Sequence, residues 1–564
     1  CSSLKLCGAS KFCAPPPPLR TSHYALFYIE GAFMHKHPMR KHPFSKMTGF
    51  FSLAISASLW YTLKIAHMDV AGELSLPGHP LLEWWDGMII LEMGAFLFLV
   101  LSFLMPYLVS WQVERKPDSP MSSFGLAWGI QFFWQIPFLL AFYPAPGMND
   151  TVYMMHHPLY ASVQFPWLYS FVYGYGSNLG IHWWETGEPV VWFLSLLQLL
   201  FMTFGLTRFC FWIKSKYHRY FGWGLYLYFL LCPMVGNYEI AAVRDGLFSL
   251  SLLFWVWLFL LQEEQPGWNR NRLLLFTIAS LGTMLLRNNG VLVSLLLTAV
   301  LFYCYGNKKI LLIGVLSALL AIVPPRIIQE TNHWEPLFQE SMGIPLQQLG
   351  RTLVVEGKRS EETVQLMNDL LEEEKWKKAY LPYTVDFVKW HDDFHRNRLN
   401  QEKGKFLVAW VETGLSNPRI YVEGWMTETY ALWNLDPWEY GVQSRFGWAL
   451  SDENTKNMKP ADNDRMAVGS LPIPMAWKSA LCNLQFEGSR FFGSGLCLWL
   501  TVFACLLLYH QKKRKNILLA LPLLLNTATL LLSTPASSVF RYSFAYVLCL
   551  PVLWGMVLIR TKQK

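Results

Sequence analysis

The stretch MIILEMGAFLFLVLSFLMPYLVSW (88–111) contains Glu92 as its only charged residue. A helix needs about 20 mainly apolar residues to cross the hydrocarbon core of a bilayer, so this stretch predicts a membrane-spanning helix. Similar runs recur along the chain and predict an all-α polytopic membrane protein with about 12 spans. The runs lie at 48–66, 88–111, 121–143, 189–212, 221–236, 244–262, 272–286, 290–306, 309–325, 493–510, 516–533 and 542–560.

The composition supports this class. Of 564 residues, 53% are hydrophobic and 15% are charged, whereas a typical soluble protein has roughly 25% charged residues. This excludes disorder and most soluble folds. The net charge of +8 fits basic cytoplasmic loops, so we expect no nucleic-acid partner. The sequence contains neither a Walker loop nor a Rossmann glycine motif, so we expect no nucleotide chemistry.

The distribution of polar residues predicts four parts. They are a cytoplasmic tail (1–47), nine transmembrane helices with an outer catalytic loop at 144–188 (48–325), a mainly helical extracytoplasmic insert (326–492), and three further helices with a cytoplasmic tail (493–564). We expect 1–33 to be non-native because the chain starts with cysteine and contains an APPPP tract. The aromatic residues of the insert indicate either a core with membrane contacts or a lid over a lipid-facing cavity.

Lysine and arginine mark one side of the membrane. The loops that follow the even-numbered predicted helices are all basic. In chain order, these five loops contain Arg115 and Lys116; Lys214, Lys216 and Arg219; Arg270 and Arg272; Lys308 and Lys309; and Lys512 to Lys515. The opposite loops 67–87 and 144–188 contain neither lysine nor arginine. Because basic loops stay in the cytoplasm, both termini are predicted to be cytoplasmic.

Three arginines break this pattern. Arg244, Arg287 and Arg541 fall at predicted outer helix ends, in short loops. Charged groups at membrane depth are costly and usually face a partner or a water-filled cavity. Each arginine either reaches the outer headgroups or contributes to a shared site.

Two aspartates are predicted on the same face. Asp150 lies in the outer segment YPAPGMNDTVYMMHHP (143–158), followed by His157, and Asp245 lies in VRDGLF (243–248). Either carboxylate can serve as a helix N-cap or meet an extracytoplasmic substrate. The adjacent histidines 156 and 157 are a weak metal pair, because neighbouring side chains on a helix point in different directions.

Two further polar segments complete this face. The first is LLRNNGVL (285–292), which separates two short apolar runs and places Arg287 and Asn288 at the outer surface. The second is SSVFRYSF (537–544), which begins the last predicted helix with Arg541 and Tyr542.

In their order and topology, these segments resemble the GT-C superfamily of polytopic membrane glycosyltransferases. The closest resemblance is to an uncharacterised bacterial family of this type, found largely in Firmicutes. The segments are YPAPGMNDT with HHP, VRDGLF, LLRNNG, GIPLQQLGR (343–351), AWVETGLSNPRIYVEGWMTETYALW (409–433) and FRYSFAYVLCLP (540–551). The resemblance implies that Asp150 is the catalytic carboxylate and that the donor is a sugar on polyprenyl phosphate. Asn149 stands where many such enzymes have a second acid, so a divalent cation is a candidate cofactor but its need stays open.

The expected reaction is sugar transfer to a cell-envelope glycan, lipid or protein at the outer face of the cytoplasmic membrane. Asp150 would act as the base, and Asp245 or His157 would position the acceptor or a metal. The substrate-binding candidates are Arg244, Arg287, Asn288, Arg541 and Tyr542, of which the arginines suit a leaving phosphate. A flippase or transporter for lipid-linked saccharides, and a polymerase of lipid-linked units, are the alternatives. The absence of a sequence repeat between the halves favours the transferase over a transporter.

Overall fold

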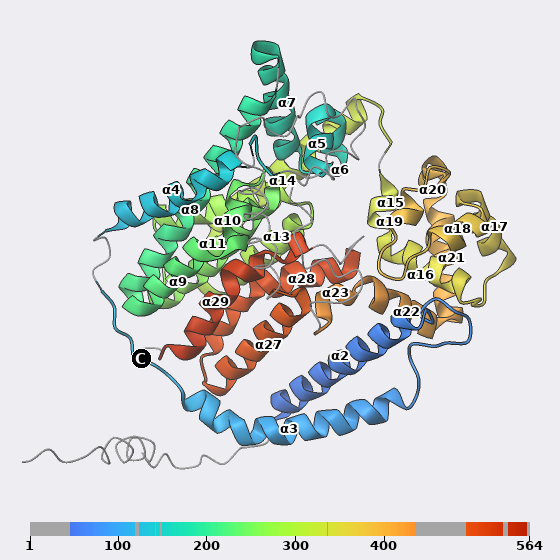
Figure 1. The fold of residues 1–564 in the computed structure, drawn as a ribbon, viewed down its shortest axis with the longest axis horizontal. Coiled ribbons are helices and arrows are strands. Elements are labelled where there is room, and N and C mark those ends of the chain that lie inside the picture. Colours follow the sequence, from blue (N-terminus) through green and yellow to red (C-terminus); the bar gives the residue numbers. More distant parts are fainter. Residues whose placement is uncertain are drawn as a thin grey trace, which may run out of the picture. The chain divides into compact units, whose positions relative to one another are not determined.

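The computed structural model describes residues 45–118, 123–141, 143–146, 149–185, 187–335, 337–435, 492–533 and 540–560, and Figure 1 shows their fold. Within these ranges the chain is helical, and the β pairing consists of three isolated bridges. The predicted all-α class is therefore confirmed for the described part of the chain. The predicted N-terminal tail, apart from its last three residues, and the insert after residue 435 lie outside the described residues.

In the described part of the chain, seven helical segments are long and apolar enough to cross a membrane. They are α2 (Lys46–Val70), α3 (Asp86–Ser110), α8 (Glu188–Lys216), α11 (Arg244–Glu264), α14 (Lys308–Thr331), the η1 and α28 segment (Arg514–Ser533), and the η2 and α29 segment (Phe540–Leu558). Shorter helices cover other predicted runs. These are α4 (Phe124–Ala141), α12 (Arg270–Leu286), α13 (Gly290–Tyr305) and α27 (Ser494–His510).

The predicted run 221–236 is a broken helix. It divides into α9 (Arg219–Leu231) and α10 (Pro233–Ile240). Pro233 restricts Cys232 to an extended backbone, which ends α9, and proline is well suited to begin the next helix. At the other end of α10, the carbonyls of Tyr238 and Ala241 accept hydrogen bonds from Gln198 Nε2 at 3.0 and 2.6 Å, so this helix end is satisfied inside the protein.

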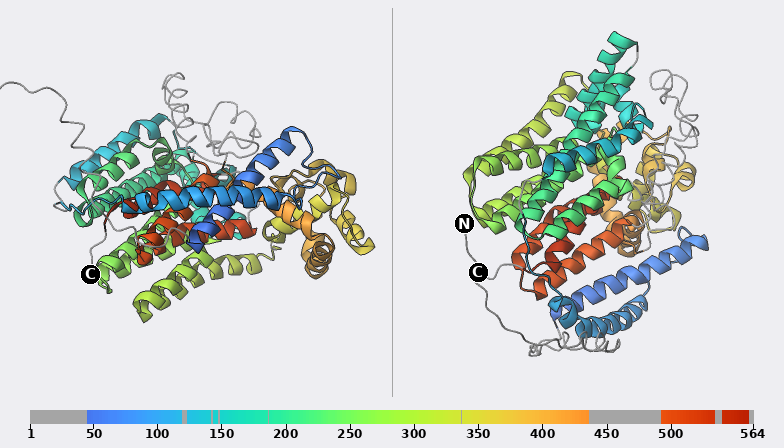
Figure 2. Two further views of the ribbon diagram at one scale, coloured as in Figure 1. Left: turned by 90° about the horizontal axis from the view of Figure 1, so that it is seen from below. Right: turned by 60° about the vertical axis from the view of Figure 1, so that its left-hand side comes forward.

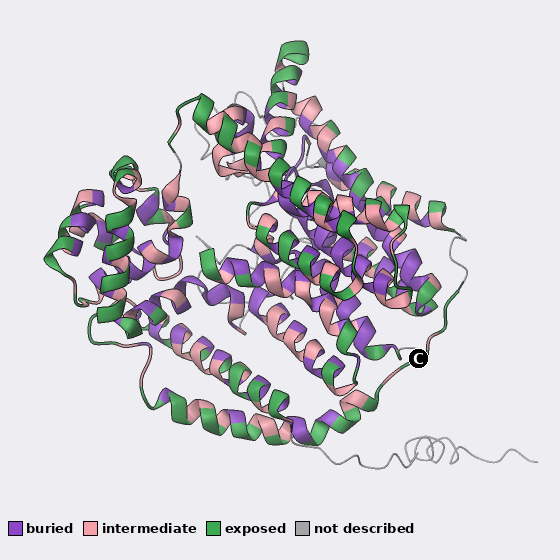
Figure 3. Ribbon diagram, turned by 180° about the vertical axis from the view of Figure 1, so that it is seen from behind, coloured by how far each residue is buried: buried purple, intermediate pink, exposed green. Residues whose placement is uncertain are grey.

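Helices α11 and α29 form the centre of the helical bundle. In the apolar window of α11, 83% of the residues are buried, against 22% for α3, and Figure 3 shows this contrast. Helix α11 packs against α8, α12 and α29. At the periphery, α2 and α3 pack together as a pair, which Figure 2 shows in blue. The first turns of α11 and α29 are consequently held in place by the most deeply buried helices of the described fold.

The loops predicted to be cytoplasmic meet at one end of the bundle. Arg115 Nη1 pairs with Glu264 Oε1 at 2.6 Å, and the backbone N–H of Val113 donates to Leu558 at 2.7 Å. Lys513 lies at the same end and donates to three carbonyls at the end of α29. The first turns of α11 and α29 lie at the other end of these helices, away from this basic surface.

That second end contains the helices of the predicted outer loop, α5 (Asn149–His156), α6 (Pro158–Gln164) and α7 (Trp167–Trp184). Thr151 Oγ1 donates to the carbonyl of Ala242 at 2.7 Å, which joins α5 to the segment before α11. Gly290 allows α12 to turn directly into α13, since a Cβ there would collide with the carbonyl oxygen of Thr283. Both connections bring polar loop residues to the same place.

The described part of the insert forms short helices around its own apolar core. They are α15 (Phe338–Ser341), α16 (Gly343–Val354), α17 (Glu361–Leu370), α18 (Glu373–Ala379), α19 (Asp386–Lys389), α20 (Arg396–Gln401), α21 (Lys403–Ser416), α22 (Pro418–Glu428) and α23 (Tyr430–Trp433). Arg351 is fully buried and pairs with Glu423 at 2.8 Å, while its Nη1 donates to the Leu74 carbonyl at 2.9 Å. This pair ties the insert to the loop between α2 and α3.

Candidate functional site

Asp150 contacts two of the three exceptional arginines. It is the second residue of α5 and is not the residue that precedes the helix, so the N-cap interpretation does not hold. Its Oδ2 accepts a hydrogen bond from Arg541 Nη1 at 2.7 Å and lies 3.7 Å from Arg244 Nη2. Arg244 begins α11 and Arg541 lies in η2 (Phe540–Ser543). Three segments far apart in the sequence therefore meet at one carboxylate.

Asp245 and Arg287 form a second, more deeply buried pair. Arg287 Nε donates to Asp245 Oδ1 at 2.8 Å, and Arg287 Nη2 contacts the same oxygen. The side chains expose only 2% and 6% of their surface. The N-cap of α11 is Val243, so Asp245 is not the cap, and its carboxylate serves Arg287 instead. Removing one member of such a pair would leave an uncompensated buried charge.

Aromatic rings lie against all three guanidinium groups. The Tyr542 ring centroid is 4.6 Å from Arg287 Cζ and 5.0 Å from Arg541 Cζ, and Phe165 lies 4.9 Å from Arg244 Cζ. Cations are attracted to ring faces, and planar guanidinium groups stack well on them. The rings thus fix the orientation of the arginines without neutralising their charge.

Hydrogen bonds from the loop after α12 hold the η2 turn in place. Arg287 Nη2 donates to the Arg541 carbonyl at 3.3 Å. Asn289 donates to Asn526 Oδ1 at 3.2 Å, and Asn526 Nδ2 donates in turn to the Tyr542 carbonyl at 3.0 Å. The position of Arg541 opposite Asp150 therefore depends on residues from α28 and from the α12–α13 turn.

The arginines determine the ionisation of Asp150. Burial opposes its ionisation, but the charges of Arg541 and Arg244 outweigh this effect and lower the pKa of the carboxyl group. Arg287 contributes in the same direction. Among the five charged side chains of the site, the positive charges exceed the negative charges by one. The site is suited to hold an anion.

Two sequence-predicted residues do not join this cluster. The His157 side chain is exposed, and its ring lies 5.2 Å from that of Tyr153. Asn288 is also exposed, and its amide donates to the Gln164 carbonyl at 2.9 Å. Among the described residues, no group of three or more histidine, cysteine, aspartate or glutamate side chains is placed to hold a metal ion.

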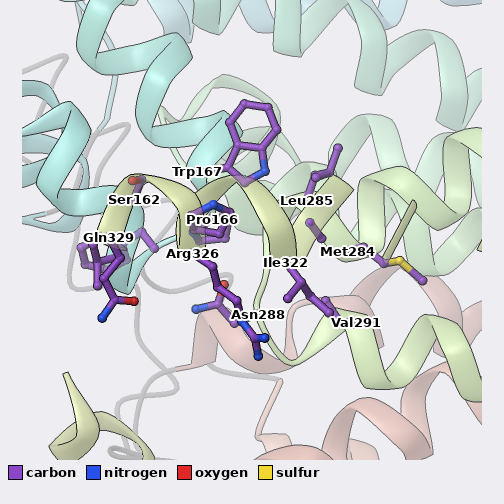
Figure 4. Close-up of a pocket in the computed structure, with 14 residues that line it drawn as sticks. Ser162, Pro166, Trp167, Met284, Leu285, Asn288, Val291, Ile322, Arg326 and Gln329 are labelled. Carbon is purple, nitrogen blue, oxygen red and sulfur yellow. The ribbon is translucent and has the colours of Figure 1, made fainter. Parts of the chain in front are cut away.

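A groove lined by both apolar and polar side chains adjoins the cluster. It has a volume of about 220 Å³ and lies between the α6–α7 junction, the α12–α13 turn and α14. Figure 4 shows it with Trp167, Asn288, Arg326 and Gln329 among its lining residues. Phe165 belongs to this lining and also contacts Arg244. The groove and the charged cluster therefore share a wall.

The groove depends on an irregularity in α14. Pro324 lacks an N–H, which leaves the Leu320 carbonyl without its usual helical donor. Trp167 Nε1 supplies the missing hydrogen bond at 2.9 Å. This bond holds α14 against the start of α7 and shapes the groove between them.

Sequence reasoning missed several residues of this site. Phe165 resembles any other aromatic residue of the outer loop, and Asn526 is a single amide in an apolar run. A buried amide within a predicted span usually has a specific partner, and this is the one signal that singles out Asn526. No pattern in the sequence indicates which rings cover the arginines.

A family model described as a family of unknown function, DUF6020, matches residues 151–564. The match begins one residue after Asp150 and includes Arg244, Asp245, Arg287 and Arg541. No curated protein and no solved structure matches the chain. Because the matched region covers well over half of the sequence, the protein belongs to the DUF6020 family.

Proposed function

We propose that this protein is a GT-C-type membrane glycosyltransferase. It transfers a sugar from a polyprenyl-phosphate donor to an acceptor at the outer face of the bacterial cell membrane. The observation that carries the proposal is the contact of Asp150 with Arg541 and Arg244, since it joins a candidate base to two anion-binding groups.

The arginines suit the leaving group. A phosphate that departs from a sugar carbon accumulates negative charge, and guanidinium groups stabilise this charge with paired hydrogen bonds. Arg244 and Arg541 retain 12% and 11% exposure of their side chains, whereas Arg287 is engaged with Asp245. We therefore assign Arg244 and Arg541 as phosphate ligands and Arg287 as a positioning residue.

The proposed transfer is a displacement at the anomeric carbon. The acceptor hydroxyl oxygen forms a bond to this carbon while the bond to the phosphate oxygen breaks. Asp150 takes the hydroxyl proton, and the electron pair of the broken bond stays on the phosphate, which Arg244 and Arg541 hold. Asp245 keeps Arg287 in place and through it the backbone of Arg541.

Donor binding would activate the base. While Asp150 is paired with two arginines its pKa is depressed, which makes it a weak proton acceptor. A donor phosphate that engages the same guanidinium groups shares their charge and releases the carboxylate. The basicity of Asp150 then rises at the moment when the donor is in place.

The adjacent groove supports a donor with an apolar chain. It is lined by apolar side chains including Phe165, Met284 and Ile322, and Arg326 lies at its rim. Helix α14, which forms one wall, is among the least buried of the span-length helices. An amphiphile with an anionic head would thus enter from the bilayer and direct its head to Arg244.

We further propose 12 spans with both termini in the cytoplasm. The helices α4, α12, α13 and α27 and the α9–α10 pair would cross the membrane in addition to the seven span-length segments. This topology supports the function because it brings Asp150 and the basic loops to opposite sides.

The test uses the full chain in lipid nanodiscs with a panel of polyprenyl-phosphate sugars and radiolabelled donor. Wild type should transfer sugar, and Asp150→Asn should lose transfer by at least about a hundredfold, as expected for a general base. Asp118→Asn is the matched control, because Asp118 pairs with Lys214 at the basic end. Full activity of Asp150→Asn, or no transfer by wild type with any donor, would refute the proposal in favour of a flippase or polymerase.

A further inference from the structure

The insert has an exposed aromatic cleft to which the proposed mechanism assigns no role. It has a volume of about 430 Å³ and is lined by Asp386, Phe387, Trp390, His391 and Asp392. Phe387 and Trp390 are 60% and 42% exposed. The core of the insert is closed by other rings, such as the buried Trp376 and Phe394, so the two exposed rings are not needed for its packing.

The charges around the cleft favour a neutral ligand with hydroxyl groups. Arg396 Cζ lies 5.1 Å from the centroid of the Trp390 ring, so a cation of the protein already interacts with this ring, while 42% of the Trp390 surface stays open to a ligand. Asp386 and Asp392 place carboxylate oxygens beside the rings. Carboxylates accept hydrogen bonds from hydroxyl groups, and the C–H faces of a sugar ring pack on aromatic rings.

The same carboxylates disfavour a membrane anchor. Aromatic side chains that sit at the headgroup level are accompanied by lysine or arginine when they bind anionic lipids. Here Asp386 and Asp392 border the rings, and the cation next to Trp390 is Arg396. The two carboxylates that line the cleft make it less suited to an anionic bilayer surface than a purely basic aromatic patch would be.

Two ion pairs lead from the cleft to Glu340 in α15. Asp386 in the cleft lies 2.9 Å from Lys389 Nζ, and this buried ammonium lies 3.2 Å from Glu340 Oε2 in α15. Burial raises the pKa of Glu340 against the effect of Lys389, and the negative charges of Asp386 and Asp150 add to the rise. Glu340 therefore lies within electrostatic range of both the cleft and the candidate base.

We propose that the cleft formed by Asp386, Phe387, Trp390, His391 and Asp392 binds a neutral sugar ring of a glycan acceptor, at a distance from the hydroxyl that is glycosylated. This inference rests on the proposed transferase function, because it assigns the acceptor class of the same reaction. It names a carbohydrate polymer as acceptor in preference to a lipid or a protein.

The first experiment measures binding without turnover. Full-length protein in nanodiscs is titrated with neutral tetrasaccharides of hexose and N-acetylhexosamine units, followed by saturation-transfer NMR. Trp390→Ala should weaken binding about tenfold, Trp390→Phe should restore part of it, and the control Trp84→Ala should bind like wild type, since Trp84 is exposed outside the cleft. Equal binding by Trp390→Ala, or no saccharide binding by wild type, would overturn the inference.

Two further probes separate other ligands. A tetraalkylammonium ion that binds in a Trp390-dependent manner, with no saccharide binding, would replace the inference with a cation site. Lipid-quenched fluorescence measures contact between the insert and anionic nanodiscs. If Trp390→Ala lost this contact, the cleft would be a membrane anchor, and the inference would be overturned as well.

A transfer assay separates failure of this inference from failure of the proposed function. The KM for a tetrasaccharide acceptor should rise about tenfold in Trp390→Ala. Transfer with an unchanged KM would refute the cleft and leave the transferase standing. Saccharide binding that depends on Trp390, in a protein that transfers nothing, would keep the cleft and refute the transferase.

Discussion

The chemistry available to Asp150 is set by the groups that face it. These are the guanidinium groups of Arg541, Arg244 and Arg287, while Glu340 of the insert interacts with Asp150 only electrostatically. Three positive charges near one partly buried carboxylate favour its ionised form. The same arrangement stabilises the fold, because the carboxylate joins α5 to the first turns of α11 and η2.

This stabilisation predicts a pH-dependent difference between wild type and Asp150→Asn. The folded pKa of Asp150 lies below the unfolded value, so the unfolded state binds more protons in the acidic range and stability rises with pH there. The contribution is complete above the unfolded pKa of about 4 and is lost as the pH falls through the folded pKa. Wild type should therefore melt at a higher temperature than Asp150→Asn at pH 7, and the gap should close toward pH 3.

Thermal melts in detergent, followed by tryptophan fluorescence between pH 3 and 7, measure this gap. Asp118→Asn is again the control, since the Asp118 carboxylate is 43% exposed and its pair with Lys214 is at the other end. A gap between wild type and Asp150→Asn that stays constant over this range would show that Asp150 contributes packing and not charge.

The charged residues of the site were predictable from sequence, but their pairing was not. Arg244, Arg287 and Arg541 stood out because a charge at an outer helix end is costly. Asp150 and Arg541 are 391 positions apart, and no local pattern determines which arginine faces which aspartate. That choice follows from the packing of α11 and α29, which the sequence does not encode in any short segment.

At the scale of elements, apolar runs predicted helix positions well and interruptions poorly. The run 244–262 corresponds to α11 and the run 290–306 to α13. Within the predicted outer loop 144–188, α6 and α7 are separate helices because Pro166 holds Phe165 in an extended conformation. The run 309–325 continues to Thr331, since the distant Trp167 satisfies a carbonyl that the prolines leave free.

Helix α29 illustrates how an element end is secured by a distant residue. Lys513 is nearly buried, and its ammonium donates to the carbonyls of Met556, Val557 and Ile559 at 3.1, 3.1 and 2.7 Å. A helix ends with carbonyls that lack intrahelical donors, and a cation there also opposes the negative end of the helix dipole. Lys513 thus serves as the C-terminal cap of α29.

Lys513→Met should destabilise the protein by about 2 kcal/mol, because it removes hydrogen bonds from a charged donor to buried carbonyls. The measurement is the thermal midpoint in detergent. Lys515→Met is the matched control, as this lysine is exposed in the same basic loop, and its midpoint should stay within about 1 °C of wild type. Equal midpoints for the two variants would mean that water caps α29 equally well.

At the scale of the whole molecule, the two ends of the helical bundle differ in chemistry. One end gathers the basic loops, with Arg115, Lys116 and Lys513 in contact with neighbouring helix ends. The other end contains the Asp150 cluster and the groove. Composition and charge predicted this segregation, because basic residues are retained in the cytoplasm. The broken α9–α10 pair is the element for which composition is least informative, as neither half has the length of a span.

Reporter fusions in a bacterial host test whether that pair crosses the membrane. Between Gly78 and Gly267 lie α3, α4, α8, the α9–α10 pair and α11. If each crosses once, the number of crossings is odd and the two glycines lie on opposite sides. Alkaline phosphatase fused after Gly78 should then be active, and a green fluorescent protein fused after Gly267 should fluoresce, because each reporter works on one side only.

The two outcomes differ in what they imply for the site. If α9–α10 did not cross, Gly78 and Gly267 would share a side and both fusions would report the same compartment. In that case the first turn of α11, with Arg244 and Asp245, would face the cytoplasm whenever Gly78 lies outside. An outer-face transferase requires these residues and the loop after α2 on the same side, so parallel reports at Gly78 and Gly267 would contradict the topology on which the donor and acceptor assignments depend.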